Sequence, residues 1–196
     1  MPTSQTKYLW NLNLLGSILL VLSILIILAF SPVRGYEISI YSSLPIIVWI
    51  FLFTSIGISI GTIFVVSAFS LDMKVCYLAC PCILIANIML TSLGLIRRYY
   101  TNSLNDSMIH IEISRDILNF GYLRSDNSYP ITHILGANIA SICNLPIEIG
   151  IGVVPIVLTV IFMLSSYCLT LASSNNKRIT MLSCAMVSTL VLTYYH

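Results

Sequence analysis

Long stretches without any charged residue are the feature that most constrains what this chain can fold into. Six runs contain no Asp, Glu, Lys or Arg: residues 8–33, 38–71, 75–96, 127–147, 149–176 and 179–196. A helix that crosses a bilayer needs about 20 mostly apolar residues, and a charge at its centre costs about 2.5–3.5 kcal/mol. Charged residues make up only 8% of the chain, against about 25% in soluble domains. The chain therefore cannot cover a globule with a solvated surface.

The runs predict an all-α fold, a polytopic membrane helix bundle with about five spans and one or two juxtamembrane helices in an outer loop. The spans are expected near residues 12–30, 46–70, 75–96, 149–172 and 179–195. The run 127–147 contains several polar residues and ends near Pro146, so we expect an interfacial or re-entrant helix there. This divides the chain into a three-span segment 1–96, an outer loop 97–148 and two further spans in 149–196.

The basic residues predict the orientation. Lys7, Lys74 and the pair Lys177 and Arg178 fall on one side of the membrane if 127–147 does not cross it. Cytoplasmic loops carry an excess of Lys and Arg, so we expect a multi-pass plasma-membrane protein with a cytoplasmic N-terminus. The segment 97–148 then faces outward.

Composition excludes several classes of function. The net charge of +2 is too small to indicate a polyanionic partner, so no nucleic acid is expected, and membrane lipid is the expected environment. Five of the six cysteines lie in predicted spans, where thiols behave as small apolar residues. Cys80-Pro81-Cys82 lacks the spacing of a zinc site. We therefore expect the cysteines to form neither a metal site nor a disulfide.

Polar chemistry is concentrated in one region. Eight of the sixteen charged residues lie within 97–126: Arg97, Arg98, Asp106, Glu112, Arg115, Asp116, Arg124 and Asp126. Residues 104–120 have the periodicity of an amphipathic helix that ends at Gly121. Its predicted inward face carries Asp106, Ile109, His110, Ile113, Ile117 and Phe120. If the chain has a reactive site, this region contains it.

Asp106 and His110 stand one turn apart on that inward face. An acid beside a buried stripe is a catalytic candidate, because desolvation and nearby cations tune its pKa. Asp106 at a helix start is equally typical of a residue that complements the helix dipole. His110 and His133 each have a structural alternative as hydrogen-bonded residues. Glu112 with Arg115 or Asp116 is typical of a solvated ion-pair face.

Two segments of this region resemble a known family. The run NDSMIHIEISRDILNFG at 105–121, followed by NSYPITHIL at 127–135, resembles the first outer loop of membrane glycosyltransferases of the GT-C class. Those proteins often show an Asp, a His one turn later, a helix ending in Gly, and then Tyr-Pro before a second juxtamembrane helix. The stretch GYEISIY at 35–41 is similar to an outer loop of archaeal membrane proteins of this type.

The resemblance implies transfer of a sugar from a polyprenyl-phosphate donor to an acceptor at the outer leaflet. It implies Asp106 as general base or acceptor-positioning carboxylate, with His110 beside it as the second catalytic candidate. Substrate-binding candidates, chiefly for the donor phosphate, are Arg97, Arg98, Arg115 and His133. Some relatives hold a divalent metal near the Asp. Asp106 has no second acid on its own face, so the spacing does not support a metal or other cofactor.

Two alternatives come from other features. GT-C enzymes carry more spans, and this sequence stops at the end of a predicted span, so we expect the N-terminal part of a longer protein. A non-catalytic small subunit of an integral membrane complex, bound to other membrane subunits, is favoured by the Gly57 and Gly61 pair and by the scarcity of polar residues within the spans. A transporter is disfavoured because no predicted span carries a midplane charge.

Overall fold

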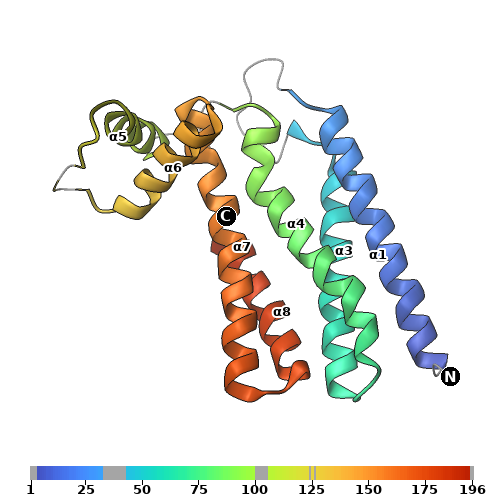
Figure 1. Cartoon of the computed structure of the whole chain (residues 1–196). Coiled ribbons are helices and arrows are strands. Elements are labelled where there is room, and N and C mark those ends of the chain that lie inside the picture. Colours follow the sequence, from blue (N-terminus) through green and yellow to red (C-terminus); the bar gives the residue numbers. More distant parts are fainter. Residues whose placement is uncertain (1–3, 33–42, 100–105, 124, 126, 195–196) are drawn as a thin grey trace. The chain divides into compact units, whose positions relative to one another are not determined.

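The computed structural model describes residues 4–32, 43–99, 106–123, 125 and 127–194. Within these residues the chain is helical and contains no strand, which confirms the predicted all-α fold (Figure 1). The elements are α1 Ser4–Ala29, α3 Ile46–Ala68, the short 3₁₀ helix η1 Met73–Val75, α4 Cys76–Ile96, α5 Asp106–Phe120, α6 Pro130–Cys143, α7 Ile147–Ser174 and α8 Lys177–Tyr194.

Four helical segments of the described chain are long and apolar enough to cross a bilayer. They are α1, α3, η1 with α4, and α7, and they coincide with four of the predicted spans. The predicted fifth span, α8, has 18 residues and begins with Lys177 and Arg178; it does not reach the same length and hydropathy and stays a prediction. Helix α6 has 14 residues, about 21 Å of helix, which is shorter than a hydrocarbon core of about 30 Å.

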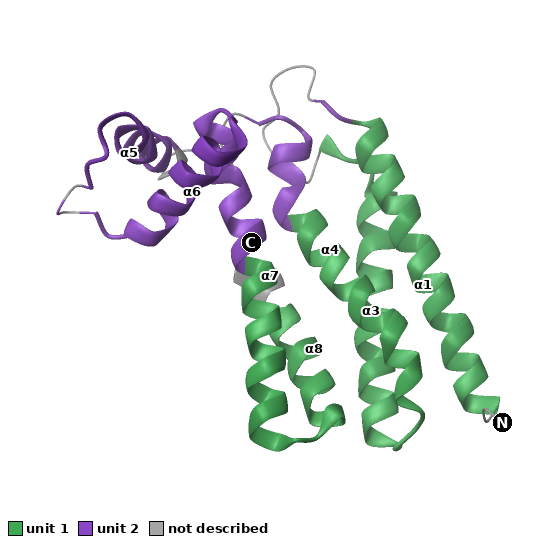
Figure 2. Cartoon of the chain, in the orientation of Figure 1, with its two compact units in different colours: residues 1–30, 37–90, 159–196 green, residues 31–36, 91–158 purple. Residues whose placement is uncertain are grey.

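The chain forms two compact units, coloured separately in Figure 2. Unit 1 comprises residues 1–30, 37–90 and 159–196, and unit 2 comprises residues 31–36 and 91–158. Unit 2 therefore contains α5, α6, the end of α4 and the first part of α7. The segments 1–96, 97–148 and 149–196 expected from the sequence stay a prediction.

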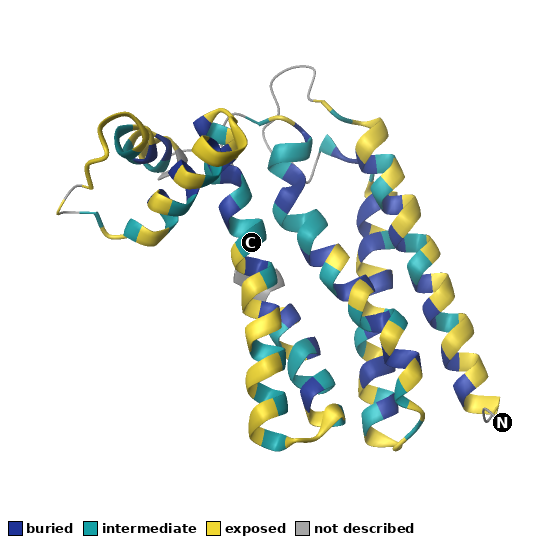
Figure 3. Ribbon diagram, viewed as in Figure 1, coloured by how far each residue is buried: buried dark blue, intermediate teal, exposed yellow. Residues whose placement is uncertain are grey.

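Helix α1 packs on α3 in unit 1, and its buried residues include small and polar ones among leucine and isoleucine. Asn13 Nδ2 donates to Thr62 Oγ1 at 2.9 Å and to the Leu9 carbonyl at 2.8 Å. Gly16 faces Ile58 so closely that a Cβ on the glycine would lie 3.2 Å from Ile58 Cγ2. The outward side of α1 is exposed (Figure 3), and between Leu14 and Leu28 its exposed side chains are all apolar. Close approach and hydrogen bonds, which drive helix association in membranes, therefore define this contact.

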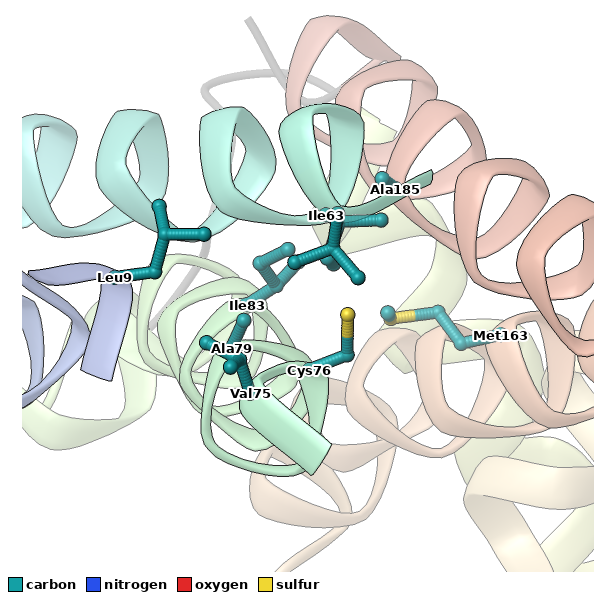
Figure 4. Close-up of a cluster of buried hydrophobic side chains, with 9 residues drawn as sticks. Leu9, Ile63, Val75, Cys76, Ala79, Ile83, Met163 and Ala185 are labelled. Carbon is teal, nitrogen blue, oxygen red and sulfur yellow. The ribbon is translucent and has the colours of Figure 1, made fainter. Parts of the chain in front are cut away.

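Unit 1 also contains an apolar core drawn in Figure 4. Its labelled members are Leu9, Ile63, Val75, Cys76, Ala79, Ile83, Met163 and Ala185. They come from α1, α3, η1, α4, α7 and α8, so residues distant in the sequence meet in one cluster. Partly buried Cys80 and Met181 pack against it.

The helices of unit 2 pack closely, and α6 and α7 approach each other at the backbone. Helix α5 packs on α6 around Ile111, Ala137, Ala140 and Ile147. Between α6 and α7, a Cβ built on Gly150 would lie 2.6 Å from the Gly136 carbonyl oxygen. Real Cβ atoms do not approach a backbone oxygen this closely, so only glycine fits at position 150.

The predicted inward face of α5 is partly wrong. His110, Ile113 and Ile117 are partly buried as expected, but Ile109 and Phe120 are 54% and 76% exposed. Ile111 and Ser114 are buried instead, so the packed face is rotated toward them. Ile111 packs against Ala137 and Ala140 of α6, while Ile109 and Phe120 stay on the outer side of α5. An apolar outer side is compatible with lipid.

The glycine contacts predict opposite results for two matched substitutions. Gly150→Ala should destabilise the protein by about 1–3 kcal/mol, the usual range for overpacking, because the new methyl group meets the α6 backbone. Gly57→Ala meets nothing within 4 Å and should leave stability unchanged or raise it. Unfolding of both variants in the same detergent measures the difference. Equal loss in the two variants would contradict the described α6–α7 contact.

Candidate functional site

Two histidines of unit 2 are brought together by the α5–α6 connection. Helix α5 ends where Gly121 adopts a φ of +63°, a conformation that glycine reaches without steric cost. Helix α6 starts at Pro130, which suits the first helical turn. His110 lies in the second turn of α5 and His133 in the first turn of α6. Both helix boundaries therefore position the pair.

The two imidazoles are hydrogen-bonded. His110 Nδ1 lies 2.6 Å from His133 Nε2, and the ring centroids are 4.9 Å apart. His133 is 1% exposed, whereas His110 is only partly buried. The Tyr129 ring packs edge-on against His110 with centroids 5.6 Å apart. One imidazole is thus accessible and the other is enclosed.

Asn127 sets the direction of this hydrogen-bond chain. Its Oδ1 accepts the backbone N–H of Tyr129 at 2.9 Å and lies 2.8 Å from His133 Nδ1. A backbone N–H can only donate, so the atom that faces both groups is the carbonyl oxygen. His133 Nδ1 must then carry the proton and donate. In the neutral pair, His133 Nε2 accepts from His110 Nδ1–H, which leaves His110 Nε2 with a lone pair.

Burial favours the neutral form of the enclosed histidine. Burial lowers the pKa of His133 below its usual value, and the neighbouring His110 lowers it further. A neutral His133 can accept a hydrogen bond, whereas an imidazolium cannot. The desolvation of His133 therefore preserves the arrangement that orients His110.

The buried side-chain atoms without a hydrogen-bond partner among the described residues include Asn127 Nδ2 and Ser114 Oγ of this unit. Groups of this kind usually bind a water molecule or a ligand oxygen. Asn127 Nδ2 belongs to the same amide that holds His133, so a donor lies next to the histidine pair.

Arg98 adopts an unusual backbone conformation at the end of α4. Its φ is +59°, its N–H donates to the Leu95 carbonyl at 3.0 Å, and the Tyr99 N–H donates to the Gly94 carbonyl at 2.9 Å. These two bonds form a Schellman motif, whose left-handed position is usually glycine. Arg98 is exposed, whereas Arg97 beside it is 2% exposed. The two arginines therefore differ in access.

Arg115 connects α5 to α7. Its Nη2 donates to Glu148 Oε1 at 2.7 Å, with the side chains 46% and 22% exposed. Exposed ion pairs of this kind contribute about 0–1 kcal/mol. A phosphate bound at Arg115 would compete with this carboxylate.

Asp106 is the first residue of α5, and its side chain lies outside the described part of the structure. The roles predicted for Asp106, Arg97, Arg98 and Arg115 stay predictions. The structure does bring together two of the predicted site residues, His110 and His133. Among the described residues, no three His, Cys, Asp or Glu side chains are grouped closely enough to hold a metal ion.

Sequence reasoning missed Asn127, Tyr129 and Glu148 as members of this region. A local signal for Asn127 exists, because Asn side chains often accept the backbone N–H two residues on, and Tyr129 stands at that spacing before Pro130. No comparable signal marks Glu148, which lies 33 residues from Arg115.

Comparisons of the chain with protein-family models, with curated proteins and with solved structures find no match.

The lowered pKa of His133 predicts how stability depends on pH. Unfolded His titrates near about pH 6.5, so below that pH the unfolded chain binds a proton that folded His133 resists. The contribution of neutral His133 to the free energy of unfolding is thus complete above about pH 6.5. It is lost as the pH falls toward the pKa of His133 in the folded protein. Unfolding midpoints in lipid between about pH 8 and pH 5 should fall on acidification.

His133→Gln should flatten this pH dependence, whereas the matched control His196→Gln, at the last residue of the chain, should retain it. A wild-type midpoint that stays constant or rises on acidification would show that His133 is not held neutral.

Proposed function

We propose that the chain is a membrane glycosyltransferase of the archaeal GT-C kind, or the N-terminal module of one. In this proposal it transfers a sugar from a polyprenyl-phosphate donor to an acceptor at the outer leaflet of the plasma membrane, with the N-terminus in the cytoplasm. The observation that carries the proposal is the oriented chain from Asn127 through His133 to His110. This hydrogen-bond chain leaves the basic nitrogen His110 Nε2 one helical turn after Asp106, the first residue of α5.

The chemistry of sugar transfer requires such a group. The acceptor oxygen forms a bond to the anomeric carbon as the bond from that carbon to the phosphate oxygen breaks, and the phosphate leaves with the electron pair. The acceptor hydroxyl must lose its proton to a base during this step. Asp106 or His110 Nε2 takes that proton. His133 and Asn127 hold the His110 ring, the role of an orienting group behind a base.

Arg98 is the best placed of the predicted phosphate ligands. A left-handed conformation costs a non-glycine residue about 1–2 kcal/mol, and such strain is found disproportionately at functional sites. The exposed guanidinium can bind a phosphate through two parallel hydrogen bonds. Arg97 is buried, Arg115 is paired with Glu148, and His133 is enclosed, so each of these would contribute less directly.

Substitution of the two candidate bases tests the proposal. Asp106→Asn or His110→Gln should lower sugar transfer by about 10²–10⁴-fold, the usual loss on removing a general base. If Asp106 only complements the helix dipole, its loss costs about 0.3–1 kcal/mol of stability without a rate effect of that size. Transfer and unfolding are measured on the same lipid-reconstituted preparation.

Asp116→Asn is the matched control for this experiment, since Asp116 lies on the same helix, and it should transfer at the wild-type rate. Near wild-type transfer by both Asp106→Asn and His110→Gln would contradict the proposed reaction.

Arg98 allows a test in which stability and binding move in opposite directions. Arg98→Gly removes the guanidinium and relieves the left-handed strain, so the protein should become more stable by about 1 kcal/mol. Binding of polyprenyl phosphate should weaken at the same time, far more than binding of ordinary phospholipid. Arg98→Gln should weaken binding without the gain in stability. Equal loss for both lipids would indicate only contact with headgroups.

The second candidate function is a non-catalytic subunit of a membrane complex. It is favoured by one observation in unit 1: Gly57 and Gly61 are exposed, and a Cβ on either would meet nothing within 4 Å. This pair is therefore open for contact with another helix. Absence of sugar transfer by the wild-type chain, together with loss of a native complex on Gly57→Ile, would favour this function over the transferase.

A further inference from the structure

Two sulfur atoms of unit 1 are in contact, and two more lie in the apolar cluster beside them. The sequence pattern does not reveal this grouping. Cys80 and Cys82, which are separated by Pro81, contact different neighbours. Cys82 Sγ lies 3.1 Å from Ser17 Oγ of α1, whereas Cys80 Sγ lies 3.2 Å from Met181 Sδ of α8. Two positions along a helix correspond to about 200°, which explains the separation. The Cys-Pro-Cys motif is therefore not one site.

The neighbours of Cys80 complete the group. Cys76 lies one turn before Cys80 on α4, so the two thiols share a helix face. Cys76 is fully buried and Met163 is 9% exposed, both in the same cluster against which Cys80 and Met181 pack. In Figure 4 the Met163 thioether extends toward the Cys76 thiol. Two thiols and two thioethers from α4, α7 and α8 thus lie in or against one apolar cluster.

We propose that Cys76, Cys80, Met163 and Met181 bind one soft monovalent cation of the Cu(I) or Ag(I) class. Thiolate and thioether sulfur select Cu(I), whereas carboxylate and carbonyl oxygens suit harder ions. Zinc sites use Cys, His, Asp and Glu ligands, and no group of three such residues is found in the described part of the chain. The use of two methionines therefore favours Cu(I) over zinc.

The charge balance suits an apolar surrounding. Binding breaks the S–H bond of Cys80, releases its proton to the solvent, and forms a bond between the sulfur and the cation. One thiolate and one monovalent cation give a neutral complex, which avoids the high cost of a net charge in an apolar interior. Cys76 and the two thioethers contribute neutral donors. The metal keeps its oxidation state, so no oxidant or reductant is needed.

Silver, which does not change oxidation state in this setting, is the probe for the experiment. The whole chain is reconstituted in phospholipid vesicles with the exposed Cys143 and Cys168 changed to Ser, so that accessible thiols do not bind the metal. Equilibrium dialysis against a competing chelator should give one tight Ag(I) per chain, with one proton released on binding. Zn(II) should not compete.

Met181→Leu should weaken Ag(I) binding by at least about tenfold, and Cys80→Ser should abolish tight binding. Met181→Leu conserves volume, so its unfolding midpoint without metal should match the background protein. The matched control is Cys82→Ser, which should bind normally because Cys82 faces Ser17. Absence of tight binding in the background protein, or equal loss in Cys82→Ser and Met181→Leu, would overturn the proposed site.

Discussion

Apolar helices in a bilayer gain little from contact with one another, because lipid tails are as apolar as their side chains. The choice of neighbours in this chain therefore depends on small residues and on buried hydrogen bonds. Asn13 joins α1 to α3 through Thr62, and Gly150 allows α7 to touch α6. The hydrogen bond between His110 and His133 belongs to the same class of contact and joins α5 to α6.

The histidine contact differs from the others because its hydrogen bonds have a direction. The Tyr129 N–H fixes the Asn127 oxygen, the oxygen fixes the proton of His133, and His133 fixes the proton of His110. Burial then favours the neutral form of His133. The same bonds that hold α5 against α6 therefore define a basic nitrogen at His110. In the proposed transferase, stability and proton transfer would depend on one hydrogen-bond chain.

Local sequence patterns predicted much of this architecture. They did not predict the contacts between residues that are distant in the sequence. Charge-free runs located four span-length helices, and Gly121 and Pro130 marked helix boundaries. The packed face of α5 was misjudged because apolar periodicity does not distinguish a protein neighbour from lipid. Arg115 pairs with Glu148 and Cys80 contacts Met181 over separations that no local spacing encodes. The role of Asn127 could have been predicted, because its hydrogen bond with the Tyr129 N–H joins residues only two positions apart.

The orientation of the histidine pair is open to direct measurement. Solid-state ¹⁵N NMR of histidine-labelled protein in lipid distinguishes protonated from unprotonated ring nitrogens, and Asn127→Ala identifies the His133 signals. Above about pH 7, where an ordinary histidine is mostly neutral, His133 should carry its proton on Nδ1 with Nε2 unprotonated. His110 should likewise be protonated on Nδ1. A His133 protonated on Nε2 would reverse the chain of donors and contradict the assignment of His110 Nε2 as a base.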